Sequence, residues 1–274
     1  MGPTYRIGVD VGGTFTDLVI ADDGGRIICL AKAASRPFSP EEGVVEALGR
    51  AAAMLNIDTK TLLSACGCFV HGTTVATNAL LTGKGARAGL LTTEGFRDAL
   101  TIRRGLRENV WDHRAPNPPL LVPRHLSLPV VGRIGRGGEE TAPLDEASVD
   151  LAAEIFVREK VEAIAVCLFN AYLNPSHEER AGEILAKALP DAYITLSSHT
   201  APIMGEYERT STAAVSAFLG PRISGYLQEL ENALRNMGYE GPLMLLQSNG
   251  GMATVAHRRR HPASLVLSGP AADR

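Results

Sequence analysis

Three short segments near the start of the chain alternate apolar and polar residues, the pattern of half-buried β-strands. They cover residues 5–11 (YRIGVDV), 15–21 (FTDLVIA) and 26–33 (RIICLAKA). Gly12-Gly13 separates the first two segments, and residues 22–25 (DDGG) separate the second from the third. Such pairs favour tight hairpin turns, because glycine adopts positive φ without steric cost. We therefore expect three antiparallel strands joined by two hairpins.

The pattern then changes to helical spacings that alternate with short apolar strands. Ser39, Pro40 and Glu42 supply an N-cap, an N1 proline and an early acidic residue, which predicts a helix over 40–54. Asn174 and Pro175 repeat this arrangement at the start of a helix that ends near residue 189. The remaining helices are expected over 73–83, 94–100 and 144–160, with two more filling 205–237.

The expected later strands are short and apolar. They cover 66–72, 86–93, 161–169, 192–198 and, as the last strand, 243–247, with one more near 126–134 inside a Pro-, Arg- and Gly-rich excursion. Residues 161–169 are apolar nearly throughout, as a strand covered on both faces must be. Three antiparallel strands followed by alternating helices and parallel strands describe an α/β fold with a mixed sheet.

Composition narrows the class of protein. The chain has 274 residues, 45% hydrophobic and 21% charged, with a net charge of −3, which suits one large or two modest globular domains and gives no footprint for nucleic acid. The basic run at 257–261 is expected to be a solvated helix end. No run of 18 apolar residues exists and no secretory signal opens the chain, so we expect no membrane association. Four cysteines in apolar runs (Cys29, Cys66, Cys68, Cys167) fit a reducing cytoplasm.

The first hairpin carries the chemistry that points to a ligand. Residues 10–17 read DVGGTFTD, with Gly12, Gly13, Thr14 and Thr16 between Asp10 and Asp17. Glycines let backbone N–H groups approach an anion closely, and the threonines add hydroxyl donors. Carboxylates beside a phosphate need a cation between them, and Mg²⁺ bound through one or two carboxylates and water meets that need. The segment therefore predicts a site for the phosphates of a magnesium nucleotide; the alternative is a tight hairpin whose acids cap its ends.

Competing phosphate motifs are missing. The Gly83-Lys84 pair lacks the upstream glycine of a P-loop, and no G-x-G-x-x-G follows a strand.

DVGGTFTD resembles the first phosphate motif of the actin-like ATPase superfamily. Five further stretches narrow the resemblance to the hydantoinase A / oxoprolinase family, whose relatives include ATP-dependent subunits of acetone and acetophenone carboxylases. They are 71–81 (HGTTVATNALL), 89–98 (GLLTTEGFRD), 205–224 (GEYERTSTAAVSAFLGPRIS), 247–251 (QSNGG) and 268–272 (SGPAA).

The resemblance implies an actin-like ATPase (ribonuclease H-like) lobe in two parts. Residues 5–200 would form the family's N-terminal domain, and 201–274 would begin its main domain, cut short before a second phosphate loop. The family continues with glycine after SGPAA, where this chain has Asp273. The nucleotide would lie between two lobes, so we expect this fragment to be inactive in isolation.

The family's chemistry is ATP-driven phosphorylation of a carbonyl oxygen in a cyclic amide (hydantoin, oxoproline or lactam), which water then opens. By resemblance, Asp10 orients Mg²⁺ through water, Gly12, Gly13 and Thr14 hold the phosphates, and Thr16 and Asp17 support the turn. Further residues would face the cleft, namely Thr73, Thr74, Asn78, Ser248, Asn249, Gly250 and Gly251. A hydantoinase B-type partner subunit is also implied.

Several alternatives stay open. Thr73 or Thr74 could serve only as a helix cap, and 248–251 could be a plain Asn-Gly turn. The chain could instead belong to a carboxylase that acts on a ketone, in which an enolate and bicarbonate are phosphorylated. It could also be a sugar kinase of the same superfamily, although that branch usually carries a cysteine-rich zinc motif, or a non-catalytic scaffold for a partner.

Four remaining features have weaker interpretations. His71 could transfer protons, and the Arg- and Trp-containing loop at 103–112 could recognise a substrate anion, form an interface or be solvated. Glu206, Glu208 and Arg209 are expected to form ion pairs on a helix surface. Cys66 and Cys68 resemble part of a zinc site, but alternation places both on one strand face, where core packing is the expected role.

Overall fold

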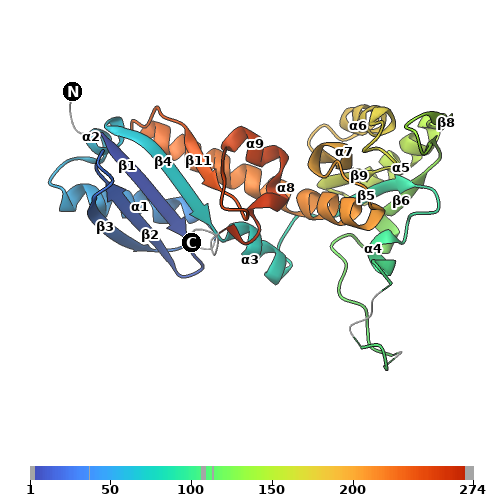
Figure 1. Cartoon of the computed structure of the whole chain (residues 1–274), viewed down its shortest axis with the longest axis horizontal. Coiled ribbons are helices and arrows are strands. Elements are labelled where there is room, and N and C mark those ends of the chain that lie inside the picture. Colours follow the sequence, from blue (N-terminus) through green and yellow to red (C-terminus); the bar gives the residue numbers. More distant parts are fainter. Residues whose placement is uncertain (1–3, 37, 106–108, 113, 269–274) are drawn as a thin grey trace. The chain divides into compact units, whose positions relative to one another are not determined.

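The computed structural model describes residues 4–36, 38–105, 109–112 and 114–268. The chain divides into two compact units, the first made of residues 1–84 and 222–274 and the second of residues 85–221. Each unit has its own sheet (Figure 1). The expected mixed α/β architecture is confirmed, but the strands that follow the first three are divided among three sheets in the two units instead of extending one.

The first unit is built on a six-stranded mixed sheet in the order β12-β11-β4-β1-β2-β3. The strands β1, β2 and β3 form the predicted antiparallel hairpins, whereas β4 runs parallel to β1 and β11 runs parallel to β4. Their bounds are β1 Tyr5–Val11, β2 Phe15–Ala21, β3 Ile27–Ala34, β4 Cys66–Thr73, β11 Leu243–Leu246 and β12 Met252–Thr254. The strand β12 pairs antiparallel with β11, so the expectation that 243–247 is the last strand was wrong.

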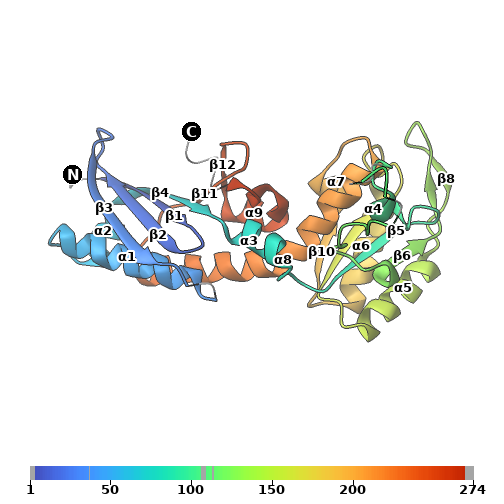
Figure 2. The same ribbon diagram turned by 90° about the horizontal axis from the view of Figure 1, so that it is seen from below.

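Helices cover one face of this sheet (Figure 2). Alternate residues of β1 (Ile7, Val9 and Val11) are buried on that face, and α1 packs there with Val44, Ala47 and Leu48. The helix α1 spans Pro40–Met54, as its N1 proline predicted. The other helical segments of the unit are α2 Thr59–Ser64, α3 Val75–Thr82, α9 Val255–Arg260 and the 3₁₀ segment η2 Pro262–Leu265.

The second unit contains a four-stranded parallel sheet in the order β10-β9-β5-β6 and a two-stranded ribbon, β7-β8. All five residues of β9 are buried, which confirms the expected strand covered on both faces. The strands are β5 Ala88–Thr93, β6 Ser127–Val130, β7 Arg133–Ile134, β8 Glu140–Ala142, β9 Ala163–Cys167 and β10 Tyr193–Leu196. The helices are α4 Ala99–Ile102, η1 Arg124–Leu126, α5 Glu146–Arg158, α6 Ser176–Ala188 and α7 Ser197–Thr200.

One long helix, α8, replaces the two helices expected over 205–237. It runs unbroken from Glu206 to Asn236, with Pro221 in its interior. Proline removes one backbone donor and usually kinks or ends a helix, but α8 continues through Pro221. The sequence expectation was wrong at this position.

The basic run at 257–261 differs from its expected role as a solvated helix end. The side chain of Arg258 is almost completely buried, and its guanidinium contacts the hydroxyl of Ser264. Arg259 donates to Glu231 at 2.8 Å. In the part of the chain that the structure describes, no helix is both long and apolar enough to cross a membrane.

Candidate functional site

The predicted site residues of the first unit meet at one edge of its sheet. The strands β1, β4 and β11 are neighbours that run in the same direction, so their carboxyl ends lie side by side. Val11, the last residue of β1, is paired with Thr73, the last residue of β4. Ligands of open α/β sheets bind at the carboxyl ends of the strands. This edge carries the Gly12-Gly13 turn, the start of α3 and the 248–251 turn.

The Gly12-Gly13 turn leaves two backbone donors for a ligand. The amide of Gly12 donates to the carbonyl of Phe15 at 3.0 Å, and the Thr14 carbonyl accepts from Ser35 at 2.9 Å. Among the described residues, the amides of Gly13 and Thr14 make no hydrogen bond. One of the expected donors is therefore used inside the hairpin, and the next two can serve an anion.

Steric room, rather than positive φ, explains Gly12, whereas a Cβ on Gly13 would lie at an ordinary contact distance of 3.7 Å from Asn78 Nδ2. Positive φ occurs at Gly25 in the second hairpin (80°) but not at Gly12 or Gly13, so our conformational argument holds only for the second turn. A Cβ on Gly12 would lie 3.1 Å from the carbonyl oxygen of Phe15, which is a tight contact with backbone. The turn is narrow at this point.

Asp10 and Asp17 point to the sheet face that α1 does not cover. Both line a cavity of about 490 Å³ on that face. A Cβ on Gly72 would lie 2.8 Å from Oδ1 of Asp10, so the glycine makes room for this partly buried carboxylate. Asp17 is half-exposed and pairs with Lys32 at 2.9 Å.

Thr16 lies on the opposite face of β2 and is completely buried. Its hydroxyl is 3.1 Å from that of Ser35, whose backbone also binds the turn. Thr16 therefore contacts the segment that holds the turn and cannot reach a ligand in solvent.

Thr73, Thr74 and Asn78 connect β4 and α3 to the turn. Thr74 donates through both its amide (2.9 Å) and its hydroxyl (3.1 Å) to the carbonyl of Val11, the residue before Gly12. Asn78 Nδ2 donates to the Thr74 hydroxyl at 3.2 Å. Buried Thr73 accepts from the amide of Val75 at 3.2 Å, which is the local capping role we left open. Thr74 and Asn78 form a chain of contacts that ends at the turn.

Residues 248–251 form a tight turn between β11 and β12. Gly250 has φ of 80° and donates to the Gln247 carbonyl at 3.0 Å, and Gly251 donates to the side chain of Asn249 at 2.9 Å. The amide of Ser248 donates to the carbonyl of Ser264 at 3.1 Å. These bonds describe an Asn-Gly turn, and its position after β11 also places it at the carboxyl edge.

His71 is a fully buried core residue. Its Nε2 lies 2.6 Å from the hydroxyl of Tyr226 on α8. Burial lowers the pKa of His71 to about 4 and raises the pKa of Tyr226 well above its usual value. The neutral imidazole thus links α8 to β4 behind the candidate site. No local sequence pattern indicates this pair, because Tyr226 lies 155 residues further along the chain.

The two cysteines near His71 lie on opposite faces of β4, not on the one face that we expected. Cys66 pairs with Tyr5 but Cys68 pairs with Arg6, because the register shifts between these two pairs. Burial raises the pKa of the Cys66 thiol to about 11. Among the described residues, no group of three or more His, Cys, Asp or Glu side chains is placed to hold a metal ion.

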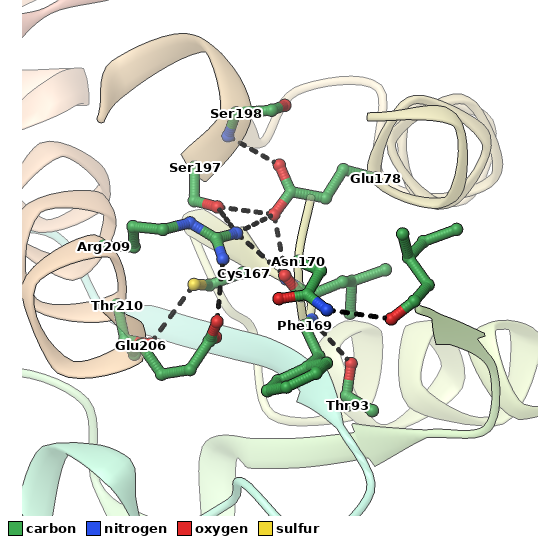
Figure 3. A network of polar contacts seen from close by, with 12 residues as sticks. Thr93, Cys167, Phe169, Asn170, Glu178, Ser197, Ser198, Glu206, Arg209 and Thr210 are labelled. Atoms are coloured by element: carbon green, nitrogen blue, oxygen red, sulfur yellow. Dashed lines mark hydrogen bonds and ion pairs between the residues drawn. The ribbon is translucent and has the colours of Figure 1, made fainter. Parts of the chain in front are cut away.

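The second unit carries a buried polar network at the carboxyl end of β9 (Figure 3). Arg209 has a side-chain exposure of 0%, so our expectation of a surface ion pair was wrong for this residue. Its guanidinium donates to the Leu168 carbonyl (2.8 Å), to Ser197 and to Glu178 (3.3 Å). Glu178, also 0% exposed, accepts further bonds from the Leu168 amide (2.8 Å) and the Ser197 hydroxyl.

Glu206 stands at the solvent side of this network. It accepts from Arg209 at 3.0 Å, and burial raises the pKa of Glu206 although Arg209 opposes the change. Glu208 behaves as expected and pairs with Arg104 at 2.5 Å.

Part of the 103–112 loop, residues 106–108, lies outside the described residues. Trp111 is 93% exposed.

Comparison with known proteins places the chain in the family that the sequence motifs resemble. Residues 6–189 match the family described as hydantoinase/oxoprolinase N-terminal region, and residues 209–273 match the family described as hydantoinase/oxoprolinase. Caprolactamase subunit alpha of Pseudomonas jessenii is 38% identical over 97% of this chain. The acetophenone carboxylase gamma subunit of Aromatoleum aromaticum is 34% identical over 96% of it, and 5-oxoprolinase 1 of Arabidopsis thaliana is 28% identical over 97%.

A solved structure also has a similar fold. The crystal structure of the ATP-dependent caprolactamase from Pseudomonas jessenii matches 97% of this chain with a TM-score of 0.89. The chain spans 39% of that structure's length, 37% of the carboxylase subunit and 23% of the oxoprolinase.

Fold and turn together define an α/β protein whose mixed sheet presents a glycine hairpin at the carboxyl ends of parallel strands. The chain belongs to the hydantoinase/oxoprolinase family. The resemblance drawn from the sequence is confirmed. The division at residues 200 and 201 and the roles of the individual site residues stay predictions.

Proposed function

We propose that this chain is the nucleotide-binding part of an ATP-dependent hydrolase that opens cyclic amides. The observation that carries the proposal is the meeting of the Gly12-Gly13 turn, Thr74 and Asn78 at one sheet edge. Phosphoryl transfer depends mainly on positioning the phosphoryl group and on neutralising its charge. The backbone amides of this edge that make no internal hydrogen bond can position the group. Relatives described as a caprolactamase and a 5-oxoprolinase support the class of substrate.

The proposed reaction begins with transfer of the γ-phosphoryl group of ATP to the amide oxygen. The carbonyl oxygen forms a bond to phosphorus while the bond between phosphorus and the bridging oxygen breaks, and that oxygen leaves on ADP. Two water molecules complete the reaction, one of which opens the C–N bond of the ring while the other releases phosphate. The amides of Gly13 and Thr14 would hold the phosphoryl group, and Thr74 and Asn78 would fix the turn during transfer.

Mg²⁺ fits the residues on this edge. Magnesium in nucleotide sites binds through one or two carboxylates, water and phosphate oxygens. Asp10 supplies such a carboxylate in a space that Gly72 keeps open, and Asp17 lies on the same face. When bound, the ion would neutralise polyphosphate charge. No larger set of protein ligands is needed for this role.

The relatives named as subunits suggest that a partner subunit, of the hydantoinase B type, completes the enzyme. We place the reaction in the cytoplasm, where ATP is available and the four free cysteines would stay reduced. A second candidate is the ATPase subunit of a ketone carboxylase, because a carboxylase subunit is 34% identical to this chain. A sugar kinase or a non-catalytic scaffold has no specific support of this kind.

A release assay tests the proposed class of reaction. ADP release would be measured with the chain in its full-length protein together with its partner subunit. The proposal predicts release that depends on a lactam, a hydantoin or oxoproline. Release that depends only on a ketone and bicarbonate would favour the carboxylase, and release with a sugar alone would contradict both.

A further inference from the structure

A second cavity of about 210 Å³ lies beside the Gly12-Gly13 turn, and we call it the turn pocket. All of its lining residues belong to the first unit. Those that carry the argument are Gly12, Gly13, Asn78, Arg36, Lys84 and Arg222. The pocket is distinct from the larger cavity that Asp10 and Asp17 line on the open sheet face.

The turn pocket is cationic. Its described lining contains three cations and no carboxylate. The charge of Arg36 is balanced, because its guanidinium lies 2.6 Å from Glu42 and 3.8 Å from Glu46. Lys84, in contrast, makes no ion pair with any described residue. The charge of Lys84 is therefore not neutralised by a described carboxylate.

Backbone contacts hold Lys84 and Arg222 together. The helix α3 ends with Gly83 in the left-handed conformation (φ 64°), and the amide of Lys84 bonds back to Ala79 at 3.0 Å. The carbonyl of Lys84 then accepts from Nη1 of Arg222 on α8 at 3.2 Å. Both residues line the turn pocket, so an anion bound there would be attracted by both side-chain charges.

Neutral donors on the same pocket complete the match to a phosphoryl group. The Gly13 amide makes no hydrogen bond among the described residues. Asn78 uses Nδ2 for one bond, to Thr74, and an amide nitrogen has two hydrogens to donate. A phosphoryl group has three oxygens that suit this mixture of amides, an ammonium and a guanidinium.

We propose that the turn pocket is the acceptor side of the site and binds the phosphoryl group once it is bonded to the acceptor oxygen. The turn then separates two environments, with carboxylates for a metal ion on one side and cations for the transferred group on the other. Transfer forms the bond between acceptor oxygen and phosphorus and breaks the bond to the bridging oxygen of ADP. Lys84 and Arg222 neutralise the charge that stays with the acceptor. This inference rests on the proposed function, because it assigns a role within the same site.

The test is calorimetric titration of the 274-residue chain with inorganic phosphate and with methyl phosphate, both without magnesium. We expect both to bind, and Lys84→Gln and Arg222→Gln each to weaken binding about tenfold. Arg222→Lys keeps the charge and should recover most of the affinity. Lys60→Gln and Arg26→Gln remove exposed cations of the same unit outside the pocket and serve as matched controls.

Three results would overturn the inference. In the first, the wild type does not bind phosphate. In the second, the Lys84→Gln and Arg222→Gln variants bind phosphate as tightly as the wild type. In the third, the wild type binds inorganic phosphate but not methyl phosphate. Circular dichroism of each variant shows whether it is folded.

Asp10→Asn separates this inference from the proposed function. It should weaken binding of magnesium ATP and leave magnesium-free phosphate binding unchanged. Unchanged binding of magnesium ATP would count against the nucleotide site alone, and lost phosphate binding would count against the separate pocket.

Discussion

Glu178 and Arg209 are both completely buried, so each charge depends on the other and on the hydrogen bonds around it. Removing one partner of a buried pair leaves an unpaired charge in the core and costs about 3–5 kcal/mol. We therefore expect Glu178→Gln to lower the free energy of unfolding by at least about 3 kcal/mol. Urea unfolding followed by circular dichroism measures this change.

Glu183→Gln is the matched control on the same helix, because the Glu183 side chain is mostly exposed and pairs only with Arg180 at 2.9 Å among the described residues. It should change the free energy of unfolding by less than about 1 kcal/mol. Replacing both buried charges, in Glu178→Leu with Arg209→Met, should recover part of the lost stability. Equal effects of Glu178→Gln and Glu183→Gln would contradict the buried network.

His71 should make the stability of the protein depend on pH. Burial lowers its pKa from 6.5 to about 4, so between these values the unfolded chain binds a proton that the folded chain does not. The stabilising contribution is fully present above pH 6.5 and is lost as the pH falls towards 4. We expect His71→Gln to flatten the fall in unfolding free energy over this range by roughly 3 kcal/mol.

Urea titrations at several pH values between 4 and 7.5 measure this slope. His125→Gln, at an exposed histidine of the second unit, is the control and should leave the slope unchanged. A slope equally steep in His71→Gln would show that other groups cause the pH dependence.

At the scale of elements, α1 contains two glycines in opposite surroundings. A Cβ on Gly43 would lie 2.8 Å from the Thr16 hydroxyl oxygen and 3.2 Å from the Ala34 carbonyl, whereas a Cβ on Gly49 would meet nothing within 4 Å. Alanine favours helices over glycine by about 1 kcal/mol. We expect Gly49→Ala to stabilise the protein by about that amount and Gly43→Ala to destabilise it by about 1–3 kcal/mol.

Thermal unfolding of the two variants measures this difference, with each serving as the other's control. Stabilisation by Gly43→Ala would mean that α1 does not pack closely against Thr16 and the turn segment.

Local signals predicted the elements better than their assembly. The helix 40–54 and the strands 5–11 and 15–21 were predicted at their observed bounds, because helix caps and strand alternation depend on residues that are close in the sequence. The two helices expected over 205–237 are one helix, because surrounding packing decides whether a helix continues through an interior proline such as Pro221. Alternation predicted that Cys66 and Cys68 share one face of the strand. The register shift at Gly67, which places them on opposite faces, could not be predicted from alternation.

At the scale of the whole molecule, the chain leaves the first unit at Lys84 and re-enters it at Arg222. The sequence predicted parallel strands but not this division, because strand pairing is set by contacts between distant residues. The strands β4 and β11, for instance, are neighbours although 170 residues separate Thr73 and Leu243. The glycine turn and its threonines could be predicted from a short stretch of sequence. Tyr226, Lys84 and Arg222 could not be assigned to this edge, because only the fold brings them near it.

Binding of magnesium ATP to this chain tests the central claim, that the Gly12-Gly13 edge holds a nucleotide's phosphates. Calorimetric titration should give a dissociation constant below about 1 mM, or roughly −4 kcal/mol. Asp10→Asn and Thr74→Val should each weaken binding about tenfold or more, while Lys60→Gln should not change it. Saturable binding that is equal in the wild type, Asp10→Asn and Thr74→Val, or no binding at millimolar ATP, would contradict the account.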